Sequence, residues 1–404
     1  MKHNQLNSKI VVFILLAIVL ASCSQLEPED TMIMAGTFAA QTQTAMPAVT
    51  QTPIPSATPT FEPTATDIFT PTPLPIVGPV GPDNFPEGVN PLTGLMVSEP
   101  ENLERRPVFV KVANYPASGR PHAGLSFADM VFEYYLGAGT NRFLAMYYGQ
   151  NSDKIGPVRS GRLVDPQIVS LYEGILGMEG AYVTILDRIV EVLGERVISG
   201  RVTCPAICDD GRQVVTSVFA DSEAMTRLAD ERGVSNERFP LEGMRFDPQA
   251  PAGGVPGEQA AILFSSLNRG EWRFDQDSGH YLRWIEDTSG QDLEMIPLVD
   301  RVTEEQLAFS NVIVIFARYT EFTPVMHDID IWDNESGERA VIFRDGQAYD
   351  VTWATPNNDE PMRFYDEDGE IFPLKPGYTW VAVFGVNSVV TDETGQWTFE
   401  FRLP

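Results

Sequence analysis

A long threonine- and proline-rich segment near the start of the chain limits which residues can fold. From about residue 37 to 82 the sequence is dense in Thr, Pro, Ala and Ser, with runs such as Thr70-Pro71-Thr72-Pro73. Such a segment has too little apolar surface to offset the entropy of ordering its backbone, and it favours an extended, polyproline-like conformation. At about 3.1 Å per residue it could reach on the order of 100 Å. We therefore predict a lipidated N-terminus and disordered stalk over residues 23–83, with folded domains from residue 84 onward.

The first 22 residues have the pattern of an export signal. Lys2 and Lys9 flank the start of an apolar stretch, Ile10–Ala21, which is shorter than the roughly 20 residues that a membrane-spanning helix needs. The run closes on Leu20-Ala21-Ser22-Cys23, which resembles the lipobox of bacterial lipoproteins. We predict a signal peptide over residues 1–22, lipidation of Cys23, and anchoring to the extracytoplasmic face of the cell membrane. The alternative is an ordinary signal peptide with an incidental cysteine.

The charge of the chain argues against whole classes of partner. It carries 28 Lys and Arg residues against 56 Asp and Glu residues, a formal net charge of −28. Nucleic acids and anionic lipid surfaces repel such a chain, so we predict that it binds no nucleic acid. Its contact with the membrane should come through the lipid on Cys23 alone.

Two further cysteines lie close together in Thr-Cys-Pro-Ala-Ile-Cys. Cys204 and Cys208 can form a small disulfide loop in the oxidising exterior of a cell. A redox pair or half of a metal site are other possibilities, but the spacing is not Cys-x-x-Cys and no histidine is nearby. We predict a structural disulfide and keep free thiols as the alternative.

Short apolar runs and helical patterns are mixed in the first folded region, residues 84–246. Asp221 has the position of a helix N-cap, and Gly233 follows the end of the same helical pattern. We expect an α/β region here. The expected strands are Val108–Val112, Val131–Leu136 and Phe143–Tyr148, and the expected helices are Asp165–Tyr172, Val183–Leu193 and Asp221–Arg232.

A Pro/Gly-rich linker, residues 247–259, precedes a β-rich region over residues 260–404. Turn signals such as Asn334-Glu-Ser-Gly337 and Asp345-Gly346 separate its strand-like stretches. The fold class is therefore mixed α/β (α+β), with an N-terminal α/β region followed by a β-rich C-terminal region. The expected strands are Tyr281–Ile285, Val312–Ala317, Ile329–Trp332, Val341–Phe343, Ala348–Trp353, Met362–Tyr365 and Thr379–Phe384.

The usual catalytic and cofactor motifs are missing from the sequence. It has no Gly-x-Ser-x-Gly, no His-Glu-x-x-His and no P-loop, and we predict no cofactor. Asp328, Asp330 and Asp333 place several oxygen ligands close together, which is a weak hypothesis for calcium. Their spacing is not that of an EF-hand, and a chain this acidic produces such groups by chance. We therefore predict no metal site.

The region from residue 129 to 162 holds the main candidate site. Arg142, Arg159 and Arg162 lie close together in a chain that is rich in acid, and arginine forks bind carboxylate or phosphate in bidentate fashion. Asp129 and Glu133 lie among apolar residues, an unusual place for unpaired charges. In one interpretation these carboxylates pair with the arginines and hold the fold together. In the other, the arginines bind an anion in a cleft and a carboxylate acts as a base.

At these residues the sequence resembles the YerB-like bacterial lipoproteins, whose members have no established biochemical function. The resemblance implies a mixed, layered α/β sandwich. The matching stretches are Asn90–Gly94, Arg120–Leu125, Ala128-Asp129 with Glu133, Thr140–Arg142, Ile155–Ser160 with Arg162, Phe309–Val314, Asp350–Trp353 and Leu374–Trp380.

The chain departs from the family pattern at two places. Family members commonly carry Asp and His around an Asn-x-Pro element, where this chain has Ala113 and Tyr115, and a His-Asn pair where it has Thr216-Ser217. If those polar residues catalyse a reaction in other members, the resemblance implies that this member lacks it.

The leading hypothesis is a non-enzymatic lipoprotein of the cell envelope. Its partner would be a cell-wall polymer, a small anionic ligand or an envelope protein, bound through Arg142, Arg159 and Arg162. The first alternative is a hydrolase or transferase acting on wall or glycan substrates, with Asp129 or Glu133 as acid/base. The second is a carbohydrate-binding module that uses the late tryptophans, which more plainly suit a core.

Overall fold

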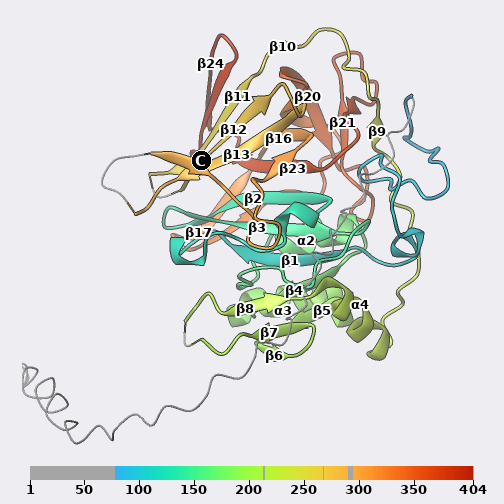
Figure 1. Ribbon diagram of the computed structural model, residues 1–404, viewed down its shortest axis with the longest axis vertical. Helices are drawn as coiled ribbons and strands as arrows, with labels where there is room; N and C mark the ends of the chain where they lie inside the picture. The colour runs from blue at the N-terminus through green and yellow to red at the C-terminus, as the bar shows by residue number, and fades with distance from the viewer. Residues whose placement is uncertain (1–77, 213, 267, 290–293, 404) are drawn as a thin grey trace, which may run out of the picture. The chain divides into compact units, whose positions relative to one another are not determined.

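The computed structural model describes residues 78–212, 214–266, 268–289 and 294–403 (Figure 1). The signal peptide, Cys23 and the stalk up to residue 77 lie outside the described residues, and their predictions stay predictions. In the described part, no helix is long and apolar enough to cross a membrane.

An 11-stranded sheet, called the central sheet below, takes strands from both expected regions, residues 84–246 and 260–404. β2 (Met130–Gly137) of the first region pairs in parallel with β23 (Thr379–Gly385) of the second. The two regions therefore share one continuous sheet. Figure 1 shows β1, β2 and β3 beside one another. The strands run in the order β10 (Val255–Pro256), β20 (Gln347–Ala354), β19 (Glu338–Arg344), β16 (Asn311–Ala317), β23, β2, β3 (Thr140–Tyr147), β1 (Val108–Ala113), β4 (Ile175–Met178) and β5 (Val197–Ser199), with β21 (Arg363–Tyr365) paired to β20.

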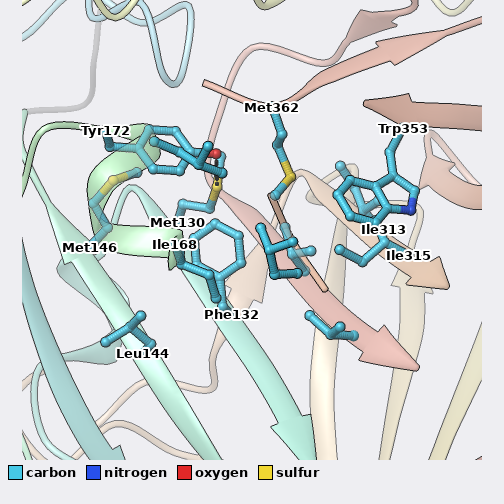
Figure 2. Packing of buried hydrophobic residues seen from close by; sticks show 14 of the residues in the cluster. Met130, Phe132, Leu144, Met146, Ile168, Tyr172, Ile313, Ile315, Trp353 and Met362 are labelled. Carbon is cyan, nitrogen blue, oxygen red and sulfur yellow. Dashed lines mark hydrogen bonds between the residues drawn. The ribbon is translucent and has the colours of Figure 1, made fainter. Parts of the chain in front are cut away.

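This sheet is covered on both faces, as the alternation along β2 shows. Met130 and Phe132 belong to one hydrophobic cluster, and Val131 belongs to another. Figure 2 shows part of the first cluster, where Phe132 and Tyr172 lie near Met362. Strands buried on both faces are typical of parallel sheets, which explains why β16 and β23 are almost wholly apolar.

A seven-stranded sheet packs against the second cluster. Its strand β11 alternates between buried and partly exposed residues, as expected of a sheet with one covered face. The aromatic rings of Trp272, Phe309 and Trp380 meet edge to face between the sheets, with centroids 5.2–5.6 Å apart. The strands run in the order β14 (Met295–Pro297), β13 (His280–Glu286), β12 (Asn268–Asp275), β11 (Gln259–Ser265), β25 (Gln396–Glu400) and β24 (Val389–Glu393), with β15 (Ala308–Phe309) paired to β13.

The remaining elements are short. As predicted, Asp221 is the N-cap of α4, and its carboxylate accepts a hydrogen bond from the N–H of Ala224 at 2.8 Å. The helices are α2 (Asp165–Leu171), α3 (Val183–Leu193) and α4 (Ser222–Glu231), with 3₁₀ turns at Pro100–Glu104, Ala117–Gly119, Leu125–Phe127 and Gly194–Arg196. The small sheets are β6 (Val202–Thr203), β7 (Ile207–Asp209) and β8 (Val218–Ala220), then β17 (Tyr319–Thr323) with β18 (Met326–Ile329), and β9 (Arg245–Phe246) with β22 (Pro373–Leu374).

The structure is β-rich with a minority of helices, compatible with the predicted α+β class, while the layered sandwich stays a prediction. One strand was predicted wrongly, at Ile329–Trp332, because β18 ends at Ile329. The side-chain carbonyl of Gln167 accepts hydrogen bonds from the backbone N–H groups of Ile331 and Trp332 at 3.1 and 3.2 Å. A side chain therefore takes the place of a neighbouring strand, and the segment forms a loop.

Candidate functional site

A gap in the parallel part of the central sheet forms the candidate site. β1 pairs with β4 over only three residues, after which the strands separate. Segment 158–161 fills the gap. The N–H of Arg159 donates to the carbonyl of Lys111 at 2.9 Å, and the N–H of Glu179 donates to the carbonyl of Arg159 at 3.1 Å. The candidate arginine segment is thus hydrogen-bonded to both strands.

The site lies at the carboxyl edge of the sheet. β1, β4 and β5 run in the same direction, and their carboxyl ends meet at one edge. Ligands of open α/β sheets bind at this edge, where neighbouring connections diverge. The register of β1 with β3 places Arg142 opposite Ala113, the last residue of β1. The fold therefore brings all three predicted arginines to one place.

Arg142 is a buried cation without a counter-ion among the described residues. It is 8% exposed, and its guanidinium donates to the carbonyl of Ser160 at 2.6 Å. Burial, followed by the positive charges of Arg162 and Arg159, lowers the pKa of Arg142 to about 9. A bound anion would stabilise the charged form against both effects.

Arg159 and Arg162 each retain an unused donor. Arg159 donates to the carbonyl of Val215 at 2.9 Å and lies 3.8 Å from a carboxylate oxygen of Glu179. Arg162 donates to the carbonyl of Gly161 at 2.8 Å. Within the described residues, the buried Nε atoms of both arginines have no hydrogen-bond partner. Buried donors are rarely left unpaired, so these two Nε–H groups are unused hydrogen-bonding capacity beside Arg142.

A fully buried ion pair supports the same segment. Lys111 Nζ lies 2.9 Å from Asp165 Oδ1, both side chains are 0% exposed, and the Tyr134 hydroxyl contacts both. Asp165 Oδ2 accepts the backbone N–H of Arg162 at 2.7 Å. Burial lowers the pKa of Lys111 to about 7. The local charges comprise four cations and two carboxylates, namely Lys111, Arg142, Arg159 and Arg162 with Asp165 and Glu179.

A disulfide-closed hairpin borders the site. Cys204 and Cys208 are bonded, with their Cα atoms 5.0 Å apart, and they close the turn between β6 and β7. Arg201, just before β6, pairs with Glu179 at 2.9 Å and also contacts Asp209 of β7. The hairpin therefore holds the carboxylate that also pairs with Arg159.

Glu133 lies apart from this cluster, in a buried network between the two large sheets. It is 1% exposed, and its partner is Arg283 of β13 at 3.1 Å rather than one of the three candidate arginines. Its carboxylate also accepts hydrogen bonds from Asn141 at 2.6 Å and from the indole of Trp380 at 2.9 Å. Burial raises the pKa of Glu133, although the charge of Arg283 opposes the shift.

Asp129 is also buried and fully engaged. Its Oδ1 accepts the Asn90 amide at 2.8 Å, and its Oδ2 accepts the N–H groups of Tyr148 and Gly149 at 2.6 and 3.1 Å. The side chain therefore ties the start of β2 to the end of β3. Burial raises the pKa of Asp129 to about 6, although the two backbone N–H groups favour the charged form.

Asp129 predicts a pH dependence of stability. Its pKa rises from an ordinary value of about 4 to about 6, so the folded state binds more protons than the unfolded state between these values. The free energy of unfolding should then fall as pH rises from about 4 to about 6, by on the order of 3 kcal/mol from this group. Urea unfolding of the wild type and Asp129→Asn at each pH measures it, because the variant should lack this slope. Asp350→Asn, at an exposed carboxylate, should keep it, and identical slopes in wild type and Asp129→Asn would contradict the assignment.

The three calcium candidates do not converge. Asp328 accepts the side-chain amide of Gln167 at 3.0 Å, and Asp330 and Asp333 lie along the wall of a cavity. Across the described ranges, no group of three or more His, Cys, Asp or Glu residues is placed to hold a metal ion.

The buried ion pairs of two cations, Lys111 and Arg283, were not predicted from the sequence. Lys111 stands alone in the apolar strand Val108–Ala113, and an isolated lysine in such a run is itself a signal of a buried pair. Arg283 gives a weaker signal, because it alternates with apolar residues like any half-exposed strand position.

The positions that depart from the family pattern border the arginine cluster. Ala113 is paired with Arg142, and the side chain of Tyr115, two residues later, is 48% exposed. Thr216-Ser217 directly follows Val215, whose carbonyl accepts the hydrogen bond from Arg159.

The chain belongs to the DUF3048 family, a two-part family described as proteins of unknown function. Residues 92–235 match its N-terminal domain and residues 260–381 its C-terminal domain. The two matches meet in the shared central sheet.

A relative in Bacillus subtilis (strain 168) is named "Putative lipoprotein YerB". It is 26% identical over 311 residues, which cover 75% of this chain and 88% of the relative. The crystal structure of YerB from Bacillus subtilis matches with a TM-score of 0.59 at 23% identity, covering 73% of this chain and 95% of that one. The structural match shows a shared fold.

Proposed function

We propose that this protein is a lipid-anchored binding protein of the cell envelope, without enzymatic activity, that holds an anionic ligand at Arg142, Arg159 and Arg162. The observation that carries the proposal is Arg142, a buried cation with no counter-ion in the described part of the chain. A protein with a net charge of −28 has many carboxylates, yet none among the described residues forms an ion pair with Arg142. The charge of Asp165 only partly opposes the lowering of its pKa.

The ligand class follows from the donors. Guanidinium groups bind the paired oxygens of phosphate and carboxylate groups, and charge-assisted hydrogen bonds of this kind are the strong ones. An anionic cell-wall polymer presents such groups in series and lies on the extracytoplasmic side of the membrane. We therefore favour a wall polymer over a small anion or an envelope protein.

The location rests on the sequence and on the relative. The lipobox-like ending at Cys23 supports a lipid anchor, and the name of the Bacillus subtilis relative describes a lipoprotein. The Thr/Pro-rich segment before Val80, which is buried and pairs with Phe246, would then separate the folded part from the membrane, toward the wall.

The enzymatic alternative has less support. It needs Asp129 or Glu133 within reach of a substrate, but both are 1% exposed and their oxygens accept hydrogen bonds from the protein. A general acid or base must lie within hydrogen-bond reach of the proton that it transfers. Both residues instead bind neighbouring protein groups and hold β2 in place. The carbohydrate-module alternative also has less support, because Trp272, Trp353 and Trp380 are 0% exposed and cannot stack against a sugar.

Replacing Arg142 by glutamine should weaken the binding of anionic wall fragments about 10- to 100-fold, because a charge-assisted hydrogen bond contributes about 1.5–3 kcal/mol. Arg159→Ala should weaken it in the same direction. The measurement is calorimetric titration of the full chain in detergent with purified wall fragments. Arg339→Ala serves as the control, since Arg339 on β19 is exposed and contacts Asp350 and Phe316, and β19 borders neither β1 nor β3. Unchanged binding in a folded Arg142→Gln variant would remove this site from the proposal.

A further inference from the structure

Exposed apolar side chains surround the arginine cluster. Most of them follow the carboxyl ends of β1, β4 and β5, three parallel strands that meet at one edge. Two more lie in the segment whose backbone carbonyl accepts the hydrogen bond from Arg159. Apolar groups that are exposed together on a protein surface mark a binding site. The six residues, called the apolar rim below, are Tyr115, Tyr182, Val183, Val202, Val214 and Val215.

The two tyrosines of the rim follow the strands on either side of the arginine segment. Segment 158–161 is hydrogen-bonded to β1 on one side and to Glu179, directly after β4, on the other. Tyr115 comes after β1, and Tyr182 comes after β4. With one chain between them, the ends of these strands are about 10 Å apart, which is twice the spacing of neighbouring strands. A ligand that contacts both tyrosines is therefore longer than a single phosphate or carboxylate group.

Both tyrosine rings are open to a ligand while their backbone is fixed. Their side chains are 48% and 72% exposed, and within the described ranges neither makes a hydrogen bond, an aromatic ring contact or a cation–π contact. The carbonyl of Tyr182 accepts the N–H of Ile185 at 2.9 Å at the start of α3. The carbonyl of Pro116, which follows Tyr115, accepts the N–H of Gly119 at 3.0 Å. Such pre-organisation lowers the entropic cost of binding.

The two parts of this surface select different features of one ligand. The guanidinium groups bind the oxygens of a carboxylate or phosphate. A tyrosine ring packs its apolar face against another apolar face, and its hydroxyl group exchanges hydrogen bonds with polar groups. A sugar ring presents both C–H faces and hydroxyl groups, and a sugar acid or sugar phosphate adds the anion. A polyol phosphate chain carries the anion but has no ring.

We propose that the ligand of the arginine cluster is an acidic glycan, with sugar rings stacked on Tyr115 and Tyr182 and acidic groups on the three arginines. This inference rests on the proposed function, and it selects, among anionic wall polymers, those built from sugar rings. The rival occupant is a protein segment with acidic and aromatic side chains. Protein anchors fill desolvated pockets, whereas the rim residues are 47–87% exposed, which favours the glycan.

The test is calorimetric titration of the full chain in detergent at about 150 mM salt, which screens long-range attraction. One probe is the hexamer of galacturonic acid, which has rings and carboxylates, and the other is linear inorganic hexaphosphate, which has no ring. The rim variant is Tyr115→Ala with Tyr182→Ala, and Tyr115→Phe with Tyr182→Phe keeps the rings. Phe322→Ala is the matched control, because Phe322 on β17 is 56% exposed and lies outside the rim.

We expect the galacturonate hexamer to bind at least tenfold more weakly to the rim variant than to the wild type, the phenylalanine variant or the control. Hexaphosphate binding should change less than twofold in the rim variant, because that probe contacts only the arginines. Arg142→Gln should weaken both probes.

The two proposals fail in different ways. If hexaphosphate binds through Arg142 but the galacturonate hexamer does not bind, or binds the rim variant as tightly as the wild type, the glycan inference is overturned and anion binding stands. Equal losses of both probes in the rim variant would overturn it too. Tighter, tyrosine-dependent binding of a hexapeptide of alternating glutamate and phenylalanine would assign the surface to a protein partner instead. If neither probe responds to Arg142→Gln, the anion site itself is removed, and the inference with it.

Discussion

Replacing Glu133 by glutamine should lower the free energy of unfolding by about 3–5 kcal/mol, because it leaves Arg283 charged and unpaired inside the protein. Arg283 is 1% exposed and lies between the rings of Trp272 and Trp380, with its guanidinium carbon 5.0 and 5.2 Å from their centroids. Glutamine keeps the size of the side chain and one acceptor oxygen. The change therefore isolates the loss of charge.

Chemical unfolding of the full chain, followed by tryptophan fluorescence, measures this effect. Asp350→Asn is the control, because the Arg339–Asp350 pair is exposed, with side chains 48% and 61% accessible. Exposed pairs contribute about 0–1 kcal/mol, so the control should remain close to the wild type. A loss for Glu133→Gln no larger than for the control would show that Arg283 does not need its partner.

Asp165→Asn should also destabilise the protein by about 3–5 kcal/mol at pH 6, because Lys111 would be left buried without a counter-charge. Asparagine can still accept the backbone N–H of Arg162. The pKa of Lys111 is about 7, so at pH 9 this lysine is mostly neutral in the wild type. The loss should therefore shrink as pH rises from 6 to 9.

A double variant separates charge from packing. Lys111→Met in the Asp165→Asn background removes the buried ammonium group, and it should restore part of the lost stability at pH 6. Losses that simply add, with no recovery in the double variant, would show that the two residues act independently.

Local patterns in the sequence predicted most helices and many strands. The helix Val183–Leu193 was predicted with the bounds that the structure has, because its apolar residues repeat at helical spacing. The N-cap at Asp221 was also confirmed, since it depends on residues within one turn. Both features are set by near neighbours in the chain.

Features that depend on distant contacts were missed. The segment after Ile329 alternates like a strand, yet the side chain of Gln167, some 160 residues earlier, takes its backbone donors. The partner of Glu133 lies 150 residues away in a sheet whose position no local pattern reveals. The strands Gln259–Ser265 and Gln396–Glu400, which pair in parallel in that sheet, were not predicted.

The candidate site was predicted in its residues but not in its structure. Arginines near residues 142–162 were conspicuous in an acidic chain, and the fold brings them together. What assembles them is the separation of β1 from β4 and the insertion of segment 158–161 between them. That separation arises from the packing of three segments, so no single stretch of sequence encodes it.

The pairing of β2 with β23 has a consequence for how the chain is made. These strands lie about 250 residues apart, and a chain is synthesised at about 5–20 residues per second. One edge of β2 therefore stays unpaired for on the order of tens of seconds, until β23 has been synthesised. Throughout that interval it presents an open, apolar strand edge, the kind of surface on which chains aggregate. The same delay applies to Glu133, whose tryptophan partner arrives with β23. A strand made early in the domain is thus among the last to be completed, and its exposed edge is confined to the period before β23 is made.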